Sequence, residues 1–256
     1  MADEELIELL SEHEHDKWMC YIAKRISKED VSIEQLVEWN RLLYAYQDLK
    51  EEDKEVYRKR ARTLLDTLDE TYDLENSDKK DAILGSKNMD IAEFDKTAGL
   101  QETYSPQSVC FGCGPANPDG LHIKSVLHYD EIVSYWKPSS KYNAFEGVLS
   151  GGIVSTLLDC HSNFSAAYHL MLYRCQTSLI PSVTAEYKVK FKRPTPINCL
   201  LYIVSKPIVV TENYAIVVSQ IIADGKLTAA SIGKFVAVKE DHPAFARWGN
   251  LCAINR

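Results

Sequence analysis

The chain has 256 residues, of which 45% are apolar and 26% are charged, a balance that is ordinary for a soluble globular protein and excludes wholesale disorder. No apolar run approaches the roughly 18 to 20 residues that a membrane-spanning helix needs. A formal net charge of −8 argues against a general nucleic-acid binder. The first ten residues are acidic where a secretory signal would be basic, and the cysteine count of seven is odd. We therefore expect a cytoplasmic protein with reduced thiols, no membrane span and no nucleic-acid partner.

The charge is distributed unevenly along the chain. Residues 1–100 contain 26 acidic and 15 basic side chains, a net of −11, whereas the remaining residues contain 11 acidic and 14 basic side chains, a net of +3. The two halves are therefore physically different, and the partners of each half must be considered separately.

The first half is predicted to be helical. Apolar residues recur at helical spacing from Glu5 to Ile26, over residues 32–43 and from about Lys50 to Glu70. The polar, weakly patterned residues that follow predict a linker, with room for a short helix at about 81–94. The domains that we expect from the whole pattern are a helical domain at 1–70, the linker at 71–107, a second folded domain at 108–240 and a C-terminal tail at 241–256.

The aromatic and histidine residues of the helical domain allow two interpretations. Its Trp and Tyr residues could form a recognition surface, but core packing of a small helical module is favoured. His13 and His15 could be metal ligands, but residues at positions i and i+2 do not share a helix face. We therefore expect these two histidines to belong to a solvated helix start.

The second half has the pattern of an α+β domain. One long helix is predicted over Gly152–Tyr173, where apolar residues repeat every three or four positions. Segments rich in β-branched and aromatic residues predict five strands, at 126–136, 182–193, 200–211, 214–223 and 227–238. This order predicts an antiparallel sheet wrapped around a central helix.

Three sequence blocks in this half are specific: CFGCGPANPDGLHI (110–123), YNAFEGVLSGGIVSTLLDC (142–160) and SVTAEYKVKFKRPTP (182–196). Together they resemble the hotdog-fold acyl-CoA thioesterases of the phenylacetate-pathway type, over about residues 108–240. The resemblance implies a hotdog fold, preceded here by a small all-helical domain. It also implies hydrolysis of a thioester to a carboxylic acid and coenzyme A, with coenzyme A entering as part of the substrate and no separate cofactor.

The resemblance assigns roles to residues at the start of the long helix. Gly151 and Gly152 match two glycines of the family motif, and Asp159 matches its acidic residue. Ser150 stands where the family has a histidine, and Cys160 where many relatives have a second acid. A backbone N–H at a helix N-terminus stabilises an oxyanion, so we expect Gly151 to be that donor and Gly152 to let the helix start approach the ligand. Asp159 is expected to be the general base or the nucleophile.

The spacing of these two groups predicts an oligomer. Eight residues of helix separate Gly151 from Asp159 by about 12 Å, so one subunit does not easily bring both to one carbonyl. We therefore expect a homodimer, or a dimer of dimers, with the site at the subunit interface. By alignment with the family, Thr184 helps to hold the attacking water and Asn143 supports the carbonyl oxygen.

A basic segment follows on the predicted strand at 182–193. Its side chains suit the phosphates of coenzyme A, but they equally suit a solvated strand edge protected against aggregation: Lys188, Lys190, Lys192 and Arg193. Cys110 and Cys113 form a CxxC pair, but no second pair has the spacing of a zinc site, so no metal is expected and the block is interpreted as a structural strand and turn.

The alternative to an enzyme is a hotdog module that has lost catalysis. Such a module would bind acyl-CoA or another ligand, with the helical domain as an interaction module. Ser150 and Cys160 favour this alternative, whereas Gly151, Asp159 and Thr184 favour hydrolysis. A hotdog dehydratase is disfavoured, because the motif lacks the histidine that such an enzyme uses.

Overall fold

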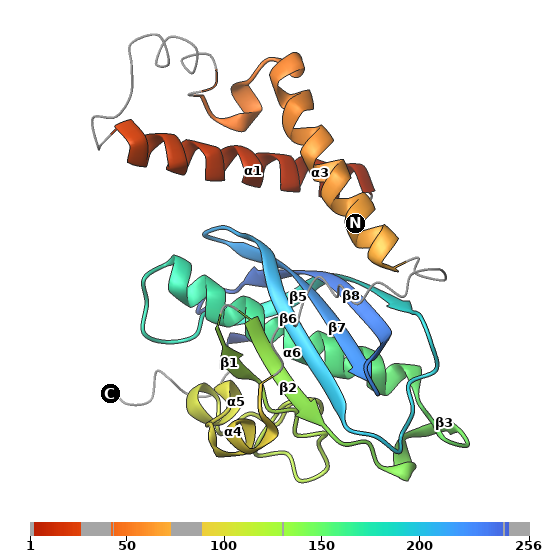
Figure 1. The fold of residues 1–256 in the computed structure, drawn as a ribbon. Helices are drawn as coiled ribbons and strands as arrows, with labels where there is room; N and C mark the ends of the chain where they lie inside the picture. The colour runs from red at the N-terminus through yellow and green to blue at the C-terminus, as the bar shows by residue number, and fades with distance from the viewer. Residues whose placement is uncertain are drawn as a thin grey trace, which may run out of the picture. The chain divides into compact units, whose positions relative to one another are not determined.

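The computed structural model describes residues 3–26, 42, 44–72, 89–129, 131–242, 244 and 245. The chain forms two compact units, Met1–Asn76 and Ser77–Arg256 (Figure 1). Among the described residues, no helix combines the length and the apolar character that crossing a bilayer requires.

The first unit contains helices α1 (Asp3–Ile26) and α3 (Glu51–Tyr72), which contact each other, and the 3-10 helix η1 (Tyr46–Asp48). The predictions of helices at 5–26 and 50–70 are confirmed. The helix predicted at 32–43 lies outside the described residues, apart from position 42. Tyr46 and Tyr57 are buried in a small core with Leu49, as expected for aromatic residues of this unit, whereas Tyr44 is exposed.

His15 corrects one prediction for this unit. Its side chain is fully buried, its ring packs edge-on against Tyr57 with centroids 5.1 Å apart, and its Nε2 lies 3.0 Å from the carbonyl oxygen of Leu42. The expectation of a solvated position was therefore wrong. The aromatic residues that enclose His15 are more than 30 residues away in the sequence, so local spacing did not show them.

The second unit contains a six-stranded antiparallel sheet in the order β1-β2-β6-β7-β8-β5, and a two-stranded sheet of β3 and β4. Its elements in chain order are α4 (Ile91–Lys96), α5 (Leu100–Tyr104), β1 (Val126–His128), β2 (Glu131–Trp136), η2 (Ser140–Tyr142), β3 (Asn143–Phe145), β4 (Val148–Leu149), α6 (Gly151–Tyr173), β5 (Ser182–Phe191), β6 (Leu201–Val210), β7 (Tyr214–Ala223) and β8 (Lys226–Ala237).

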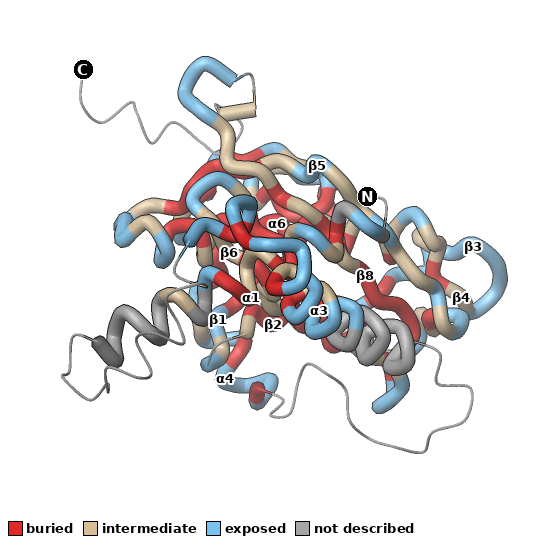
Figure 2. The backbone as a smooth tube through the Cα atoms, turned by 90° about the horizontal axis from the view of Figure 1, so that it is seen from above, coloured by how far each residue is buried: buried red, intermediate tan, exposed pale blue. Residues whose placement is uncertain are grey.

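Helix α6 is the centre of the second unit. It contacts β2, β5, β6, β7 and β8, and the buried part of the backbone runs through α6 and the strands around it (Figure 2). Leu157, Leu158 and Leu170 are completely buried between the helix and the sheet. The prediction of an antiparallel sheet wrapped around one long helix, the hotdog arrangement, is therefore confirmed.

Two parts of the second unit differ in detail from the sequence pattern. The strand predicted at 126–136 is a hairpin of β1 and β2, because the chain turns at Tyr129, whose φ is +56°. Within the range predicted as a linker, α4 and α5 are described. Asp90 caps α4 by accepting from the N–H groups of its first turn, and Phe94 packs against Tyr135 with ring centroids 5.3 Å apart. Residues 89–104 therefore have tertiary contacts of their own.

Candidate functional site

The first turn of α6 presents free backbone donors at Gly151 and Gly152. The first hydrogen bond of the helix runs from Val154 N to Ser150 O at 3.0 Å, so the N–H groups of the three preceding residues have no acceptor within the helix. Ser150 occupies the N-cap position, but its side chain makes no capping hydrogen bond. The positive end of α6 is therefore available to an anion or a carbonyl oxygen.

Within their own unit, Gly151 and Gly152 both have space for a side chain. A Cβ atom at Gly151 would lie 3.5 Å from the ring of Phe191, and one at Gly152 would meet only Ser150 Oγ at 3.8 Å. Both are ordinary van der Waals contacts. Within the described residues, nothing crowds these two positions, which leaves space for a molecule outside the protomer.

Asp159 and Thr184 form the polar centre of the candidate site. Thr184 donates from Oγ1 to Oδ1 of Asp159 at 2.7 Å, and the same hydroxyl accepts from Nδ2 of Asn163 at 3.4 Å. Ser182 in turn donates to Oδ1 of Asn163 at 3.0 Å. Asn163 and Ser182 are buried, whereas Thr184 is exposed and Asp159 is half-buried. This line of hydrogen bonds therefore runs from the core to a carboxylate that solvent can reach.

A bulge in β5 places Thr184 on the helix side of the sheet. The register with β8 shifts between Thr184 and Glu186, so Ala185 is the extra residue. Side chains alternate along a strand, and without the bulge Thr184 and Tyr187 would point to opposite faces. With it, both face α6: Thr184 bonds to Asp159, and Tyr187 donates to the carbonyl oxygen of Ser155 at 3.2 Å.

Tyr187 anchors β5 to the part of α6 that precedes Asp159, through its hydrogen bond to Ser155. Burial raises the pKa of its phenol far above the ordinary value, and the nearby charge of Asp159 raises it further. Tyr187 therefore remains a neutral hydrogen-bond donor at any physiological pH. Neither Tyr187 nor Asn163 was assigned to the site from the sequence, although Asn163 lies four residues after Asp159 and therefore on the same side of the helix.

The structure brings Asn143 to the same end of α6 as Gly151. Asn143 begins β3 and pairs with Leu149 of β4, two residues before Gly151. Asp159 lies eight residues along the continuous helix from Gly151, about 12 Å at 1.5 Å per residue. The candidate residues of one protomer thus form two groups, one at the helix N-terminus and the other two turns along.

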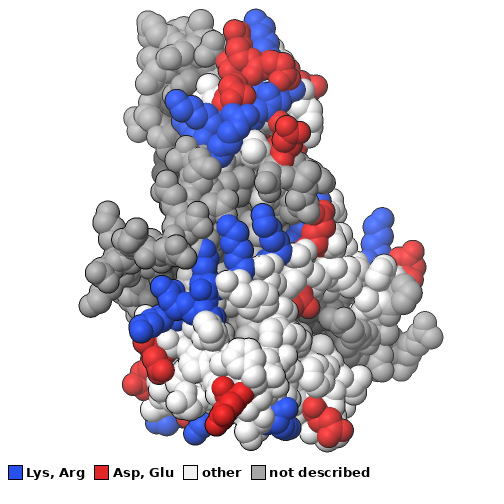
Figure 3. Space-filling view, turned by 90° about the vertical axis from the view of Figure 1, so that its right-hand side faces the viewer, with Lys and Arg blue, Asp and Glu red and all other residues white. Residues whose placement is uncertain are grey.

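The basic segment of β5 lies on the strand face opposite α6. Phe191 lies near Gly151 and Tyr187 bonds to α6, so the alternating lysines point away from the helix. Arg193, just beyond the strand, donates to the carbonyl oxygen of Leu227 at 2.9 Å. Figure 3 shows Lys and Arg side chains gathered on part of one face, with acidic side chains near them and further acidic side chains mixed with basic ones at the top of the view. We call Lys188, Lys190 and Lys192 the lysine stripe.

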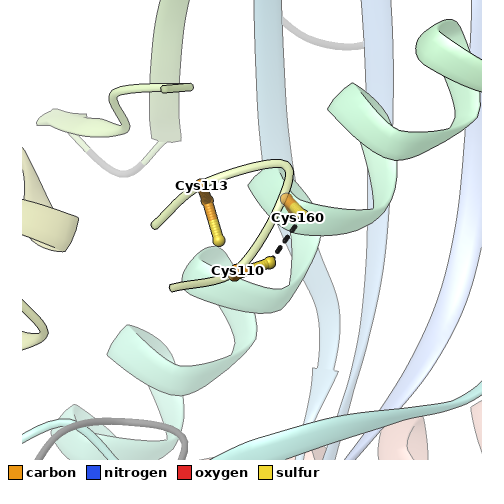
Figure 4. A group of neighbouring side chains, drawn as sticks. All are labelled: Cys110, Cys113 and Cys160. Atoms are coloured by element: carbon orange, nitrogen blue, oxygen red, sulfur yellow. Dashed lines mark hydrogen bonds between the residues drawn. The ribbon is translucent and has the colours of Figure 1, made fainter. Parts of the chain in front are cut away.

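Three thiols converge beside the candidate site. Cys110 and Cys113 come from the loop before β1, and Cys160 from α6; their sulfur atoms all lie within 4.8 Å of one another (Figure 4). The Sγ atoms of Cys110 and Cys160 are 3.8 Å apart. Hydrogen bonds from the thiols of Cys113 and Cys160 lower the pKa of Cys110. The pKa of Cys160 is raised by the hydrogen bonds that Cys160 makes with the other two thiols and by the burial of its side chain. Negative charge in this cluster is therefore favoured on Cys110. The loop forms turns, without the strand expected there.

His161 is engaged in a separate buried network. Its Nδ1 lies 2.9 Å from Ser125 Oγ and its Nε2 lies 2.9 Å from the carbonyl oxygen of Ile132. Ser125 is bonded in turn to Gln101 through both its hydroxyl and its N–H, at 2.8 Å each. Complete burial lowers the pKa of His161 to about 4. This histidine thus joins α6 to β2 and α5 as a neutral ring, and both of its nitrogens have partners.

Comparisons with known proteins return solved structures for the second half of the chain. One is a phenylacetic acid degradation-related protein from Ralstonia eutropha, 18% identical, with a TM-score of 0.39, covering 46% of this chain and 86% of that one. Another is a thioesterase superfamily protein from Shewanella loihica, 23% identical, with a TM-score of 0.38, covering 46% and 91%. A third is the PaaI protein of the Escherichia coli phenylacetic acid degradation operon, 15% identical, with a TM-score of 0.39, covering 46% and 81%.

No protein-family model matches the sequence. The three solved structures are named for the thioesterase superfamily or for phenylacetic acid degradation, and at 15–23% identity the similarity concerns the fold alone.

Proposed function

We propose that this protein is an acyl-CoA thioesterase, which hydrolyses a thioester to a carboxylic acid and coenzyme A. The observation that carries the proposal is the 2.7 Å hydrogen bond from Thr184 to Asp159 at an accessible position of the central helix. A carboxylate held in a fixed orientation and open to solvent is what a general base or a nucleophile needs.

The proposed reaction follows from these groups. Asp159 removes a proton from a water molecule while the water oxygen attacks the thioester carbonyl, or its carboxylate attacks the carbonyl directly and water cleaves the resulting anhydride. The oxygen of the carbonyl becomes an oxyanion that accepts from the N–H of Gly151, supported by Asn143. Collapse of this intermediate breaks the C–S bond, and the thiolate of coenzyme A leaves. Thr184, whose proton is directed at Asp159, orients the carboxylate.

The proposal needs two copies of the chain. Gly151 and Asp159 of one protomer are about 12 Å apart along α6, too far to act on one carbonyl. Two α6 helices that pair antiparallel would bring Asp159 of each to the N-terminus of the other. The uncrowded glycines and the exposed ring of Phe191 beside them, 56% accessible, support an interface at this end of α6.

Coenzyme A is proposed to bind through its phosphates to the lysine stripe and Arg193. Charge-assisted hydrogen bonds from lysine and arginine are the usual means of holding phosphate. The protein is proposed to act in the cytoplasm, where its thiols would be reduced.

The alternative is a hotdog module that binds acyl-CoA without hydrolysing it. Ser150 favours this reading, because it stands in the place of the family's histidine and makes no capping bond. Cys160 is weaker evidence for this alternative, because its side chain is buried against Cys110, whereas the carboxylate of Asp159 is accessible.

Thiol release from acyl-CoA esters of increasing chain length tests the proposal. The wild-type protein is expected to release coenzyme A, and Asp159→Asn to be slower by about 100-fold or more, since acid–base groups typically contribute about 10²- to 10⁴-fold. Asp224→Asn, at the exposed turn between β7 and β8, is the matched control and should retain full activity. Equal rates for wild type and Asp159→Asn would refute the mechanism. Binding of acyl-CoA without release by the wild type would favour the module.

A further inference from the structure

The loop that carries Cys110 and Cys113 is shaped to approach Cys160. A Cβ atom at Gly112 would lie 2.4 Å from Sγ of Cys160, and one at Gly114 would lie 2.4 Å from the backbone nitrogen of Cys110. No real Cβ atom tolerates such distances. Both glycines of the CFGCG sequence are therefore required, the first for the approach to α6 and the second for the turn itself.

Main-chain hydrogen bonds hold this loop on both sides. Gly114 N donates to Cys110 O at 2.8 Å within the turn, while Leu121 N donates to Phe111 O at 2.7 Å and Ile123 N to Gly112 O at 3.0 Å. Cys160 is held equally firmly in the middle of α6. The three sulfur atoms are thus positioned by backbone that is already fixed, which is the condition for a preorganised ligand set.

The sulfur positions match the requirements of a zinc ion. Tetrahedral Zn²⁺ with Zn–S distances of about 2.3 Å holds its sulfur ligands about 3.8 Å apart, and Cys110 and Cys160 have this separation. The third sulfur, that of Cys113, lies within 4.8 Å of both, so it has to approach by about 1 Å at most to complete the set. We infer that Cys110, Cys113 and Cys160 together bind one Zn²⁺ ion, which joins the CFGCG loop to helix α6.

The fourth position of this site is left to solvent. His161 follows Cys160 in the sequence, but both of its ring nitrogens are bonded to Ser125 and Ile132. Cys113 and Cys160 are buried, whereas Cys110 is only half-buried, so water reaches the cluster on the Cys110 side. Three protein ligands and one water is a common zinc arrangement. The expectation that no metal binds rested on the lack of a second pair with the spacing of a zinc site, whereas the third sulfur of this cluster comes from Cys160 alone, 47 residues after Cys113.

Two other states of the cluster have to be separated from a zinc site. Buried free cysteines can serve as small apolar side chains, and two of the three could form a disulfide and leave the third unpaired. The first state would give the reduced protein no useful zinc affinity, and the second is removed by the reductant, which leaves all three thiols available. The distinction therefore depends on metal binding by the full-length, reduced chain, and it is independent of thioesterase activity.

The test uses two reciprocal cysteine variants. One keeps only the cluster and replaces the remaining cysteines by serine (Cys20, Cys175, Cys199 and Cys252). The other replaces Cys110, Cys113 and Cys160 by serine and keeps the rest. Each reduced, chelator-treated protein is titrated with Zn²⁺ against a chromophoric chelator and then with Co²⁺, whose thiolate complexes have a charge-transfer absorption band.

Wild type and the cluster-only variant are expected to bind one Zn²⁺ per chain with the same affinity and to show the thiolate–Co²⁺ band. The reciprocal variant should lose affinity by more than about 100-fold, because the loss of an outer-shell partner alone typically costs about 10- to 100-fold. Gly112→Ala keeps every thiol but displaces the loop, and should weaken binding as well. Failure of the cluster-only variant to bind while it remains folded by circular dichroism would overturn the inference. So would equal binding by the reciprocal variant.

Discussion

Replacement of Gly151 by proline isolates the proposed oxyanion donor. Gly151 is the first residue of α6, a position where proline is favoured because its missing N–H has no acceptor within the helix. Ser150 before it has φ −59° and ψ 134°, and this extended ψ is the one that a following proline permits. The substitution therefore removes one backbone N–H with little change to the fold. Gly151→Ala, which retains the N–H, is the control.

The expected magnitude follows from these contacts. A Cβ at position 151 meets only the Phe191 ring at 3.5 Å, so the first side-chain carbon of either variant is not overpacked within the protomer. Proline restricts the unfolded chain and should change the free energy of unfolding by about +0.4 to +1 kcal/mol. Loss of one oxyanion donor costs about 2.7 to 4 kcal/mol in the transition state, a fall in kcat of about 10²- to 10³-fold. KM should change little.

The assay is steady-state thiol release from the best acyl-CoA substrate, combined with thermal unfolding of each variant. Gly151→Pro with wild-type kcat and a melting temperature no lower than that of the wild type would refute the assignment of this N–H. A site shared between subunits also predicts that the same variant can be complemented by a second, inactive variant. When Gly151→Pro and Asp159→Asn chains are mixed in equal amounts, half of the dimers are mixed and each has one intact site, so about a quarter of wild-type activity should return. Recovery of none would contradict a site shared between subunits.

Three further predictions concern other residues. Thr184→Val should lower kcat by about 10- to 100-fold, because a hydrogen bond to a charged group contributes about 1.5 to 3 kcal/mol, and Thr184→Ser should restore most of it; equal rates for the two variants would count against orientation by the hydroxyl. Glutamine at all positions of the lysine stripe should raise KM for acyl-CoA with little effect on kcat, unlike Lys226→Gln at an exposed site; an unchanged KM would leave the stripe as a solvated edge. The pKa of His161 is about 4 in the folded state, below its unfolded value of about 6.5, so the unfolded chain binds more protons between these values. The free energy of unfolding is therefore almost unaffected by this ring above pH 6.5, and the ring should lower it by about 3 kcal/mol as the pH drops to 4. Denaturant unfolding with a chelator present measures this fall. An NMR titration of this ring near pH 6.5 would contradict the shift.

Local sequence patterns predicted the elements of the second unit well. Apolar residues at every third or fourth position predicted a helix over 152–173, and α6 spans Gly151–Tyr173. Segments rich in β-branched and aromatic residues predicted strands at 182–193, 200–211, 214–223 and 227–238, and β5, β6, β7 and β8 lie at these places. Such patterns succeed because each depends only on the period of its own element. The hairpin turn at Tyr129 was missed, since no glycine or proline marks it.

The contacts between elements could not be read from any local pattern. Thr184 faces Asp159, on the same side of β5 as Tyr187, because one extra residue interrupts the alternation of side chains along the strand. A bulge of this kind leaves no periodic pattern in the sequence. His15 is buried because η1 and α3 enclose it from more than 30 residues away. Asn163 lies four residues after Asp159 on the same helix, but its bonds to Ser182 and Thr184 depend on how β5 crosses the helix.

The sequence by itself determined the central helix and the strands, because these depend on side-chain type and on spacing within one element. Its resemblance to a known family, and not spacing, pointed to Gly151 and Asp159 as the residues that carry the proposed chemistry. Only the tertiary structure decided which polar groups hold Asp159, and that Cys160 meets Cys110 at 3.8 Å across 50 residues of chain. The physical reason is that such contacts arise when the sheet closes around α6, where the packing of distant segments fixes distances that no period along the chain encodes.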